Sequence, residues 1–222
     1  MKRLFIATWL TLPVAAYAYH MGPGQDHLRL DGAATLIASA DAHAAEAVRL
    51  TATEGEIAAR GEWFEAEAEY AEALSLLPGE RVGGLKALVV TARDVRRIKL
   101  ERAKAQMNIS KLPDANASLA GLVTELLEDP NADPTLLADT QRTFASSQYY
   151  LTWLLRLEGA AREDWEPHID SARQTYKLLA SQAEATGAEG SEVIKAREDL
   201  ESAIRLARMD LSELQGLPLP SQ

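Results

Sequence analysis

The chain of 222 residues contains no cysteine. This absence excludes disulfide bonds, thiolate metal sites, covalent attachment of a c-type haem and lipid modification of a cysteine. Aromatic residues are also few, at 6% of the chain, and β-branched residues are scarce beside alanine and leucine. Alanine and leucine lose little conformational freedom in a helix, so the composition predicts an all-α fold.

Basic residues are outnumbered, with 23 lysines and arginines against 33 aspartates and glutamates, for a net charge of −10. Proteins that bind nucleic acid or anionic lipid without sequence specificity neutralise phosphates with lysine and arginine, so we expect neither partner. The length suits one domain or a short array of repeats.

The N-terminus has the layout of a secretory signal peptide. Lys2 and Arg3 precede an apolar run at residues 4–15, which ends in an A-x-A sequence at residues 16–18. We predict cleavage after residue 18 and export, to the periplasm, of a protein with 21 basic residues, 33 acidic residues and a net charge of −12. The alternative is an uncleaved anchor on the membrane, although the run is shorter than the roughly 20 residues that cross a bilayer.

Glycine, proline and capping residues divide residues 19–215, read as one α-helical domain, into about eight helices. We predict helices at residues 26–39, 42–60, 62–77, 82–110, 114–128, 134–158, 167–186 and 191–215. Asp133 and Ser191 are the expected N-caps, and Pro167 is expected to open its helix. The prolines of residues 216–222 predict a flexible, non-helical tail.

Five residues of the segment 62–77 recur at spacings of three or four and therefore share one helical face: Trp63, Ala66, Tyr70, Ala73 and Leu77. The alanines let a neighbouring helix approach closely, and Tyr70 fills the space between them. We expect Gly61 to form the turn from the preceding helix and Pro78 to end this one.

The same segment resembles the second half of a tetratricopeptide repeat, which has glycine, an aromatic residue, alanine, an aromatic residue, alanine and proline at these spacings. The matching residues are Gly61, Trp63, Ala66, Tyr70, Ala73 and Pro78. Upstream, Leu50 and Ile57 match large residues of the first half, but Glu54 stands where the family has a small one.

A looser echo of the repeat lies at about residues 149–180, where Ala172 and Tyr176 repeat the spacing of Ala66 and Tyr70. The resemblance implies antiparallel helical hairpins, one at about residues 45–78, stacked into a short solenoid or a compact array. An irregular helical bundle, in which one hairpin matches by chance, is the alternative.

The sequence contains no recognisable catalytic or phosphate-binding motif. Its histidines, His20, His27, His43 and His168, lack the spacing of a metal site, and His43 with Glu46 is expected to be a solvated ion pair. Carboxylates are so numerous that an acidic pair carries no information. We therefore predict no catalytic residue, no cofactor and no metal.

A cluster of cations at residues 92–106 is the first candidate binding surface. On a helix, four of them are expected on one side, opposite Leu88, Ala92, Val95 and Ile98. These four, termed the basic residues, are Arg93, Arg96, Arg97 and Lys104. They could pair with acidic helices nearby, as exposed ion pairs commonly do, or dock an acidic segment of a partner.

The second candidate surface is the aromatic run of Tyr149, Tyr150 and Trp153. Consecutive tyrosines cannot both point into one core, so at least one is expected at a rim, where Tyr and Trp are typical anchors of protein interfaces. Packing against Trp165 is the alternative.

Together these features predict an exported, non-catalytic helical scaffold or adaptor that binds a peptide or protein partner in the cell envelope. The alternatives are an irregular helical small-ligand-binding protein or enzyme, which a closed apolar pocket with convergent polar groups would favour, and an accessory subunit of a membrane complex.

Overall fold

A computed structural model describes residues 23–77, 92–187 and 190–216, and all of its regular structure is helical. Within these ranges there are eight helices and no strand, which confirms the all-α prediction. The helices are α2 (Pro23–Glu54), α3 (Glu56–Leu76), α4 (Ala92–Asn108), α5 (Leu112–Glu128), α6 (Pro134–Leu157), α7 (Arg162–Thr186), α8 (Gly190–Arg208) and α9 (Leu211–Gln215). The predicted signal peptide at residues 1–18, residues 78–91 and the tail at 217–222 lie outside the described residues.

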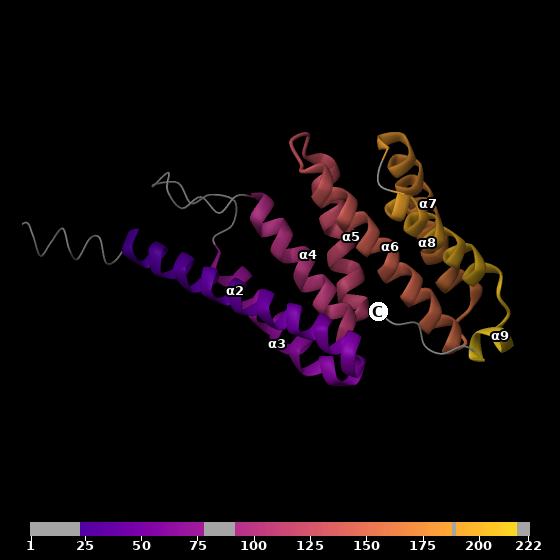
Figure 1. Ribbon diagram of the computed structural model, residues 1–222, viewed down its shortest axis with the longest axis horizontal. Coiled ribbons are helices and arrows are strands. Elements are labelled where there is room, and N and C mark those ends of the chain that lie inside the picture. Colours follow the sequence, from indigo (N-terminus) through magenta and orange to yellow (C-terminus); the bar gives the residue numbers. More distant parts are fainter. Residues whose placement is uncertain (1–22, 78–91, 188–189, 217–222) are drawn as a thin grey trace, which may run out of the picture.

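The helices form a side-by-side array in which each packs mainly on the next one along the chain (Figure 1). Helix α2 packs on α3, α3 on α4, and so on to α8, with smaller contacts of α6 with α4 and α9. The array therefore grows in one direction, from the α2–α3 hairpin to the α7–α9 end.

The first hairpin turns at Gly55 and not at Gly61, so the prediction of a turn at Gly61 was wrong. Gly55 has φ 92° and ψ 171°, a conformation that is open almost only to glycine, whereas Gly61 lies inside α3. The predicted break at residues 39–42 is also absent, and α2 continues through it. Ser39 and Asp41, which could have capped a helix there, instead hydrogen-bond Glu69 and Tyr70 of α3.

The predicted apolar face of α3 is confirmed. Ala66 and Ala73 are fully buried and Tyr70 is 1% exposed, so small residues with one ring between them do form the contact with neighbouring helices. Across this contact the Tyr70 hydroxyl donates to Asp41 of α2 at 2.5 Å. His43 of α2 pairs with Glu62 of α3 at 2.6 Å, not with Glu46 as expected.

In the middle of the array the helix bounds agree closely with those predicted from the sequence. Helix α6 begins at Pro134, and the Asp133 side chain accepts from the backbone N–H groups of Thr135 and Leu136, as its predicted capping role requires. Helix α5 begins two residues earlier than predicted, at Leu112, with Pro113 in its first turn. Helix α4 ends at Asn108, close to the predicted end.

The C-terminal helices depart from the prediction in two places. Helix α7 begins at Arg162, so Pro167 lies inside it, in the second turn, where its missing N–H removes one helical hydrogen bond. The predicted last helix is divided into α8 and α9. Asp210 forms a capping box with Glu213 and starts α9, a signal that the sequence contained.

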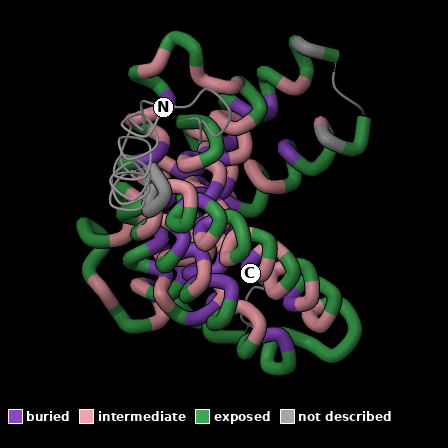
Figure 2. The backbone as a smooth tube through the Cα atoms, turned by 90° about the vertical axis from the view of Figure 1, so that its left-hand side faces the viewer, coloured by how far each residue is buried: buried purple, intermediate pink, exposed green. Residues whose placement is uncertain are grey.

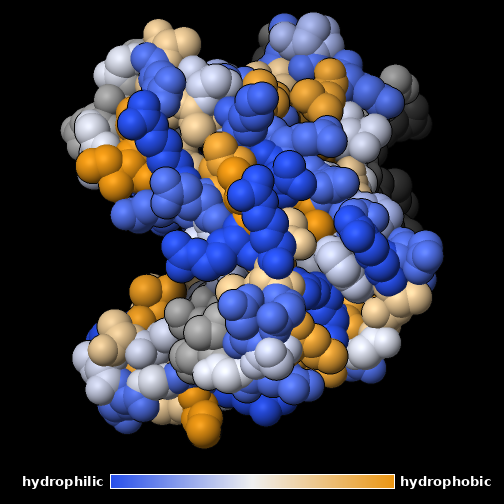
Figure 3. All heavy atoms as spheres, turned by 90° about the vertical axis from the view of Figure 1, so that its right-hand side faces the viewer, coloured by the Kyte–Doolittle hydropathy of each residue, from blue (hydrophilic) through white to orange (hydrophobic). Residues whose placement is uncertain are grey.

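Buried residues occur where the helices face one another along the array (Figure 2), and the apolar ones form three separate clusters. The first joins α2, α3 and α4, the second α4, α5 and α6, and the third α6, α7, α8 and α9. The end of the array formed by α7–α9 has a mainly hydrophilic surface with small, separate hydrophobic patches (Figure 3). None of the described helices is long and apolar enough to span a bilayer.

Candidate functional site

The basic residues of α4 all pair with carboxylates from other helices or from the residues that flank them. The pairs are Arg93–Asp133 at 2.5 Å, Arg96–Glu125 at 2.8 Å, Arg97–Asp41 at 3.4 Å and Lys104–Asp139 at 2.9 Å. These partners come from α2, α5 and α6 and from the residue before α6. The cations therefore tie α4 to the acidic helices around it.

Arg96 is buried, which corrects the prediction that it shares an exposed face. Its side chain is 9% exposed and bonds both Glu125 and Asp129, the latter at 2.6 Å. These two hydrogen bonds raise the pKa of the Arg96 guanidinium above its ordinary value. Because α4 is packed between α3 and α5, a helix face that looks purely polar in sequence is covered by α5.

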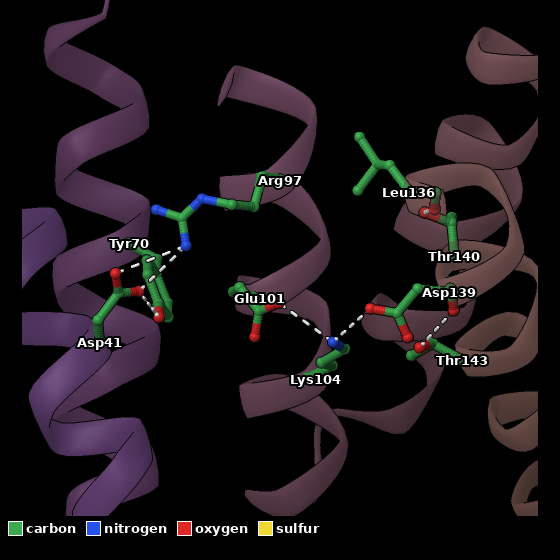
Figure 4. A network of polar contacts seen from close by, with 9 residues as sticks. All are labelled: Asp41, Tyr70, Arg97, Glu101, Lys104, Leu136, Asp139, Thr140 and Thr143. Carbon is green, nitrogen blue, oxygen red and sulfur yellow. Dashed lines mark hydrogen bonds and ion pairs between the residues drawn. The ribbon is translucent and has the colours of Figure 1, made fainter. Parts of the chain in front are cut away.

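Arg93 and Arg97 remain at the surface, with side chains 72% and 44% exposed. They line a cleft of about 400 Å³ between α4 and the start of α6, together with Asp133 and Asp139. Figure 4 shows the neighbouring polar network, with Asp41 between Arg97 and Tyr70 and with Lys104 between α4 and α6. Charges of both signs line this cleft, so charge alone does not select an acidic segment.

A second pocket, termed the aromatic pocket, lies where the α2–α3 turn meets the α4–α5 connection and α6. Its volume is about 340 Å³. The residues that line it are Thr51, Glu56, Trp63, Asn108, Ser110, Leu112, Pro113, Tyr150, Trp153 and Leu154. Trp63 comes from the apolar face of α3, and Tyr150 and Trp153 come from the aromatic run in α6. Two features that the sequence analysis treated separately therefore form one site.

The three aromatic residues of the run have different positions. Tyr150 packs on the α4–α6 cluster and lines the aromatic pocket, while Tyr149 packs on the α6–α9 cluster, and the two rings meet edge to face with their centres 5.5 Å apart. Trp153 is 5% exposed and belongs to both the pocket and the α6–α9 cluster, which also contains Trp165. Both tyrosines are half-buried and belong to different apolar clusters, although their rings touch.

Ser110 gives the pocket wall an unusual backbone conformation. It has φ 66°, and among the described residues it is the one residue other than glycine with a positive φ. The Lys111 N–H donates to the Gln106 carbonyl at 3.1 Å, which closes the end of α4 in a Schellman-type turn. Glycine is the usual residue at this position, so the serine brings a hydroxyl to the pocket at some conformational cost.

We compared the chain with models of protein families, with curated proteins and with solved structures. No match was found. The interpretation of the site therefore depends on its geometry. Among the described residues there is no group of three histidine, aspartate or glutamate side chains placed to hold a metal ion.

Glu67 is a buried carboxylate that the sequence analysis missed. It is 5% exposed and accepts from Arg102 at 2.9 Å, Lys111 at 2.6 Å and Gln106 at 3.2 Å. Burial alone would raise its pKa, but the hydrogen bonds from Lys111 and Arg102 outweigh it and lower the pKa. The spacing offered a signal, because Glu67 lies four residues after Trp63 on the buried face of α3.

Arg156 is a second buried charge that was missed. Its guanidinium donates to the carbonyls of Leu206 and Met209 at the end of α8 and lies 4.7 Å from the centre of the Trp165 ring. Burial lowers the pKa of this guanidinium below its ordinary value. A cation favours the negative end of a helix dipole, so Arg156 fixes the junction of α8 and α9 against α6.

Proposed function

We propose that the protein is a non-catalytic helical adaptor that holds a segment of a protein partner at the aromatic pocket. The observation that carries this proposal is the convergence of Trp63, Tyr150 and Trp153 from two distant parts of the chain. Trp and Tyr are the residues most enriched among the anchors of protein interfaces. A volume of about 340 Å³ is at the small end of the range for ligand pockets, which suits a single inserted side chain.

The proposal includes a tetratricopeptide-like architecture and a position in the cell envelope. The array of successive helices and the alanine–tyrosine contact of α3 support the first, since solenoids of helical hairpins bind extended partners on their surfaces. The basic, apolar and A-x-A order of residues 1–18 supports export. Arg93 and Arg97, the exposed members of the basic residues, would contact the same partner outside the pocket.

Site-specific photo-crosslinking in the cells that produce the protein tests this function. A benzophenone amino acid replaces Leu154, which lines the pocket, and in a matched control it replaces Leu178 of α7, which is similarly exposed but does not line it. We expect a discrete protein adduct from position 154 that is lost when Trp63→Ser is introduced. Equal adducts from both positions, or none from position 154, would contradict the proposal.

A small-ligand-binding protein is the second candidate, because polar groups surround the rings of the pocket. Thr51, Asn108 and Ser110 line its wall, and the Thr51 hydroxyl and the Asn108 amide each donate to a carbonyl of their own helix. Rings with a few placed polar groups are the usual lining of a small-molecule site. Native mass spectrometry of the protein purified from its own cells separates the candidates: a retained small molecule, released by Trp63→Ser, would favour the carrier.

A further inference from the structure

The aromatic pocket has one strongly ionisable side chain in its wall, and that side chain is acidic. Glu56 is the only aspartate, glutamate, lysine or arginine among the described residues that line it. The nearby cations are engaged elsewhere. Arg60 lies over the Phe64 ring at 5.8 Å, and Lys111 bonds Glu67 at 2.6 Å. The one charged side chain in the wall of the pocket is therefore negative, in a protein that is itself acidic.

The rings of the pocket complement such a charge. The faces of Trp and Tyr rings attract cations through the ring quadrupole, and aromatic residues joined by a carboxylate form a typical binding site for organic ammonium groups. Tyr150 stays neutral over the physiological range, because burial, with nearby charges including Glu56, raises its pKa to about 12. It therefore contributes an uncharged ring and hydroxyl.

Helix ends do not offset the charge of Glu56. The last turns of α2 and α4 reach the pocket at Thr51 and Asn108, and the first turns of α3 and α5 reach it at Glu56 and Leu112. Two negative and two positive dipole ends thus meet there, and their contributions largely cancel. The carboxylate remains the charge that selects a ligand.

We infer that the aromatic pocket binds an alkylammonium cation, the side chain of a lysine in the bound segment, between its rings and Glu56. The assignment to a lysine rests on the proposed adaptor function, whereas the preference for a cation rests on the pocket alone. A lysine has a methylene stem that suits the apolar wall of Leu112, Pro113 and Leu154 and a compact charged end for the carboxylate.

NMR titration of the purified protein tests the cation preference without a partner. The probes are n-butylammonium and its neutral counterpart 1-butanol, followed through the indole N–H signals of Trp63 and Trp153. We expect butylammonium to bind at least about fivefold more tightly than butanol, and Glu56→Gln to remove that preference. Glu54→Gln, an equal charge change on an exposed residue outside the pocket, is the matched control and should retain it.

Equal affinity for the two probes, or equal losses in Glu56→Gln and Glu54→Gln, would overturn the assignment of a cation. A third probe, the tripeptide acetyl-Ala-Lys-Ala-amide, tests the source. Binding of the tripeptide at the same indole signals supports a lysine of a partner, and binding of butylammonium without the tripeptide overturns it. If position 154 gave no photo-adduct, the adaptor function would be contradicted, but the titration with butylammonium and butanol would be unaffected. The two proposals can therefore fail independently.

Discussion

Gly55 and Gly61 provide a direct test of where the first hairpin turns. A Cβ added at either glycine has no atom within 4 Å, so alanine at these positions differs only in the backbone conformation it must adopt. At Gly61, inside α3, alanine is the better helix former, and we expect Gly61→Ala to raise the free energy of unfolding by about 0.5–1 kcal/mol. At Gly55, with φ 92° and ψ 171°, we expect Gly55→Ala to lower it by about 1–3 kcal/mol.

Urea denaturation followed by circular dichroism measures both changes against the unmodified protein, and thermal unfolding gives a second reading. For a chain of this size 1 kcal/mol corresponds to roughly 2–4 °C in Tm, so the two variants should lie several degrees apart, on opposite sides of the parent. If Gly61→Ala destabilises and Gly55→Ala does not, the turn lies at Gly61 as the repeat pattern suggested, and α3 does not begin at Glu56.

Three further predictions concern buried and half-buried polar groups. Glu67→Gln should cost about 1–3 kcal/mol by urea denaturation at pH 7, because the partly exposed Lys111 and Arg102 lose the charge of their buried carboxylate partner. This cost should be complete above the ordinary carboxyl pKa and should disappear as the pH falls through the lowered pKa of Glu67. His43→Gln should destabilise the protein most below about pH 6.5 and progressively less as the pH rises through the raised pKa of His43, because Glu62 stabilises the charged imidazole. Urea unfolding of both proteins from pH 5 to 8 measures this. A stability difference that does not change with pH would contradict it. Tyr70→Phe should cost about 1–2 kcal/mol through the lost hydrogen bond to Asp41, and an unchanged urea midpoint would exclude that contribution.

The helical class and much of the punctuation could be predicted because they depend on local chemistry. Asp133 followed by Pro134 is a local signal that favours a helix start, and the spacing of Ala66 and Tyr70 defines a helix face wherever that helix begins. The same independence explains the error at Gly61. The repeat pattern matched the face of α3, but the face does not determine which of two glycines bends the chain, and of the two only Gly55 has a positive φ.

The site could be predicted only in part, because its residues come from separate helices. Trp63, Tyr150 and Trp153 were recognisable as anchors from their chemistry, but their convergence depends on how α3 and α6 pack around α4 and α5. Glu56 gave no signal, since a glutamate at the first position of a helix is ordinary. The basic residues were expected on one side of a helix, but they pair with carboxylates of different helices, and the burial of Arg96 follows from the packing of α5, which no local pattern encodes.

The succession of nearest-neighbour contacts along the array also determines which helices are destabilised by a local defect. The described helices contain three small cores in series. A destabilising substitution in α8 should therefore lower the stability of the C-terminal core first and should affect the other cores mainly through α7 and α6. In such a variant, backbone amide hydrogens of the C-terminal helices should exchange faster, while those of α2–α5 should keep their protection. The aromatic pocket, built from α2 to α6, touches the C-terminal core through Trp153, so that indole is where a defect in α8 would first reach it.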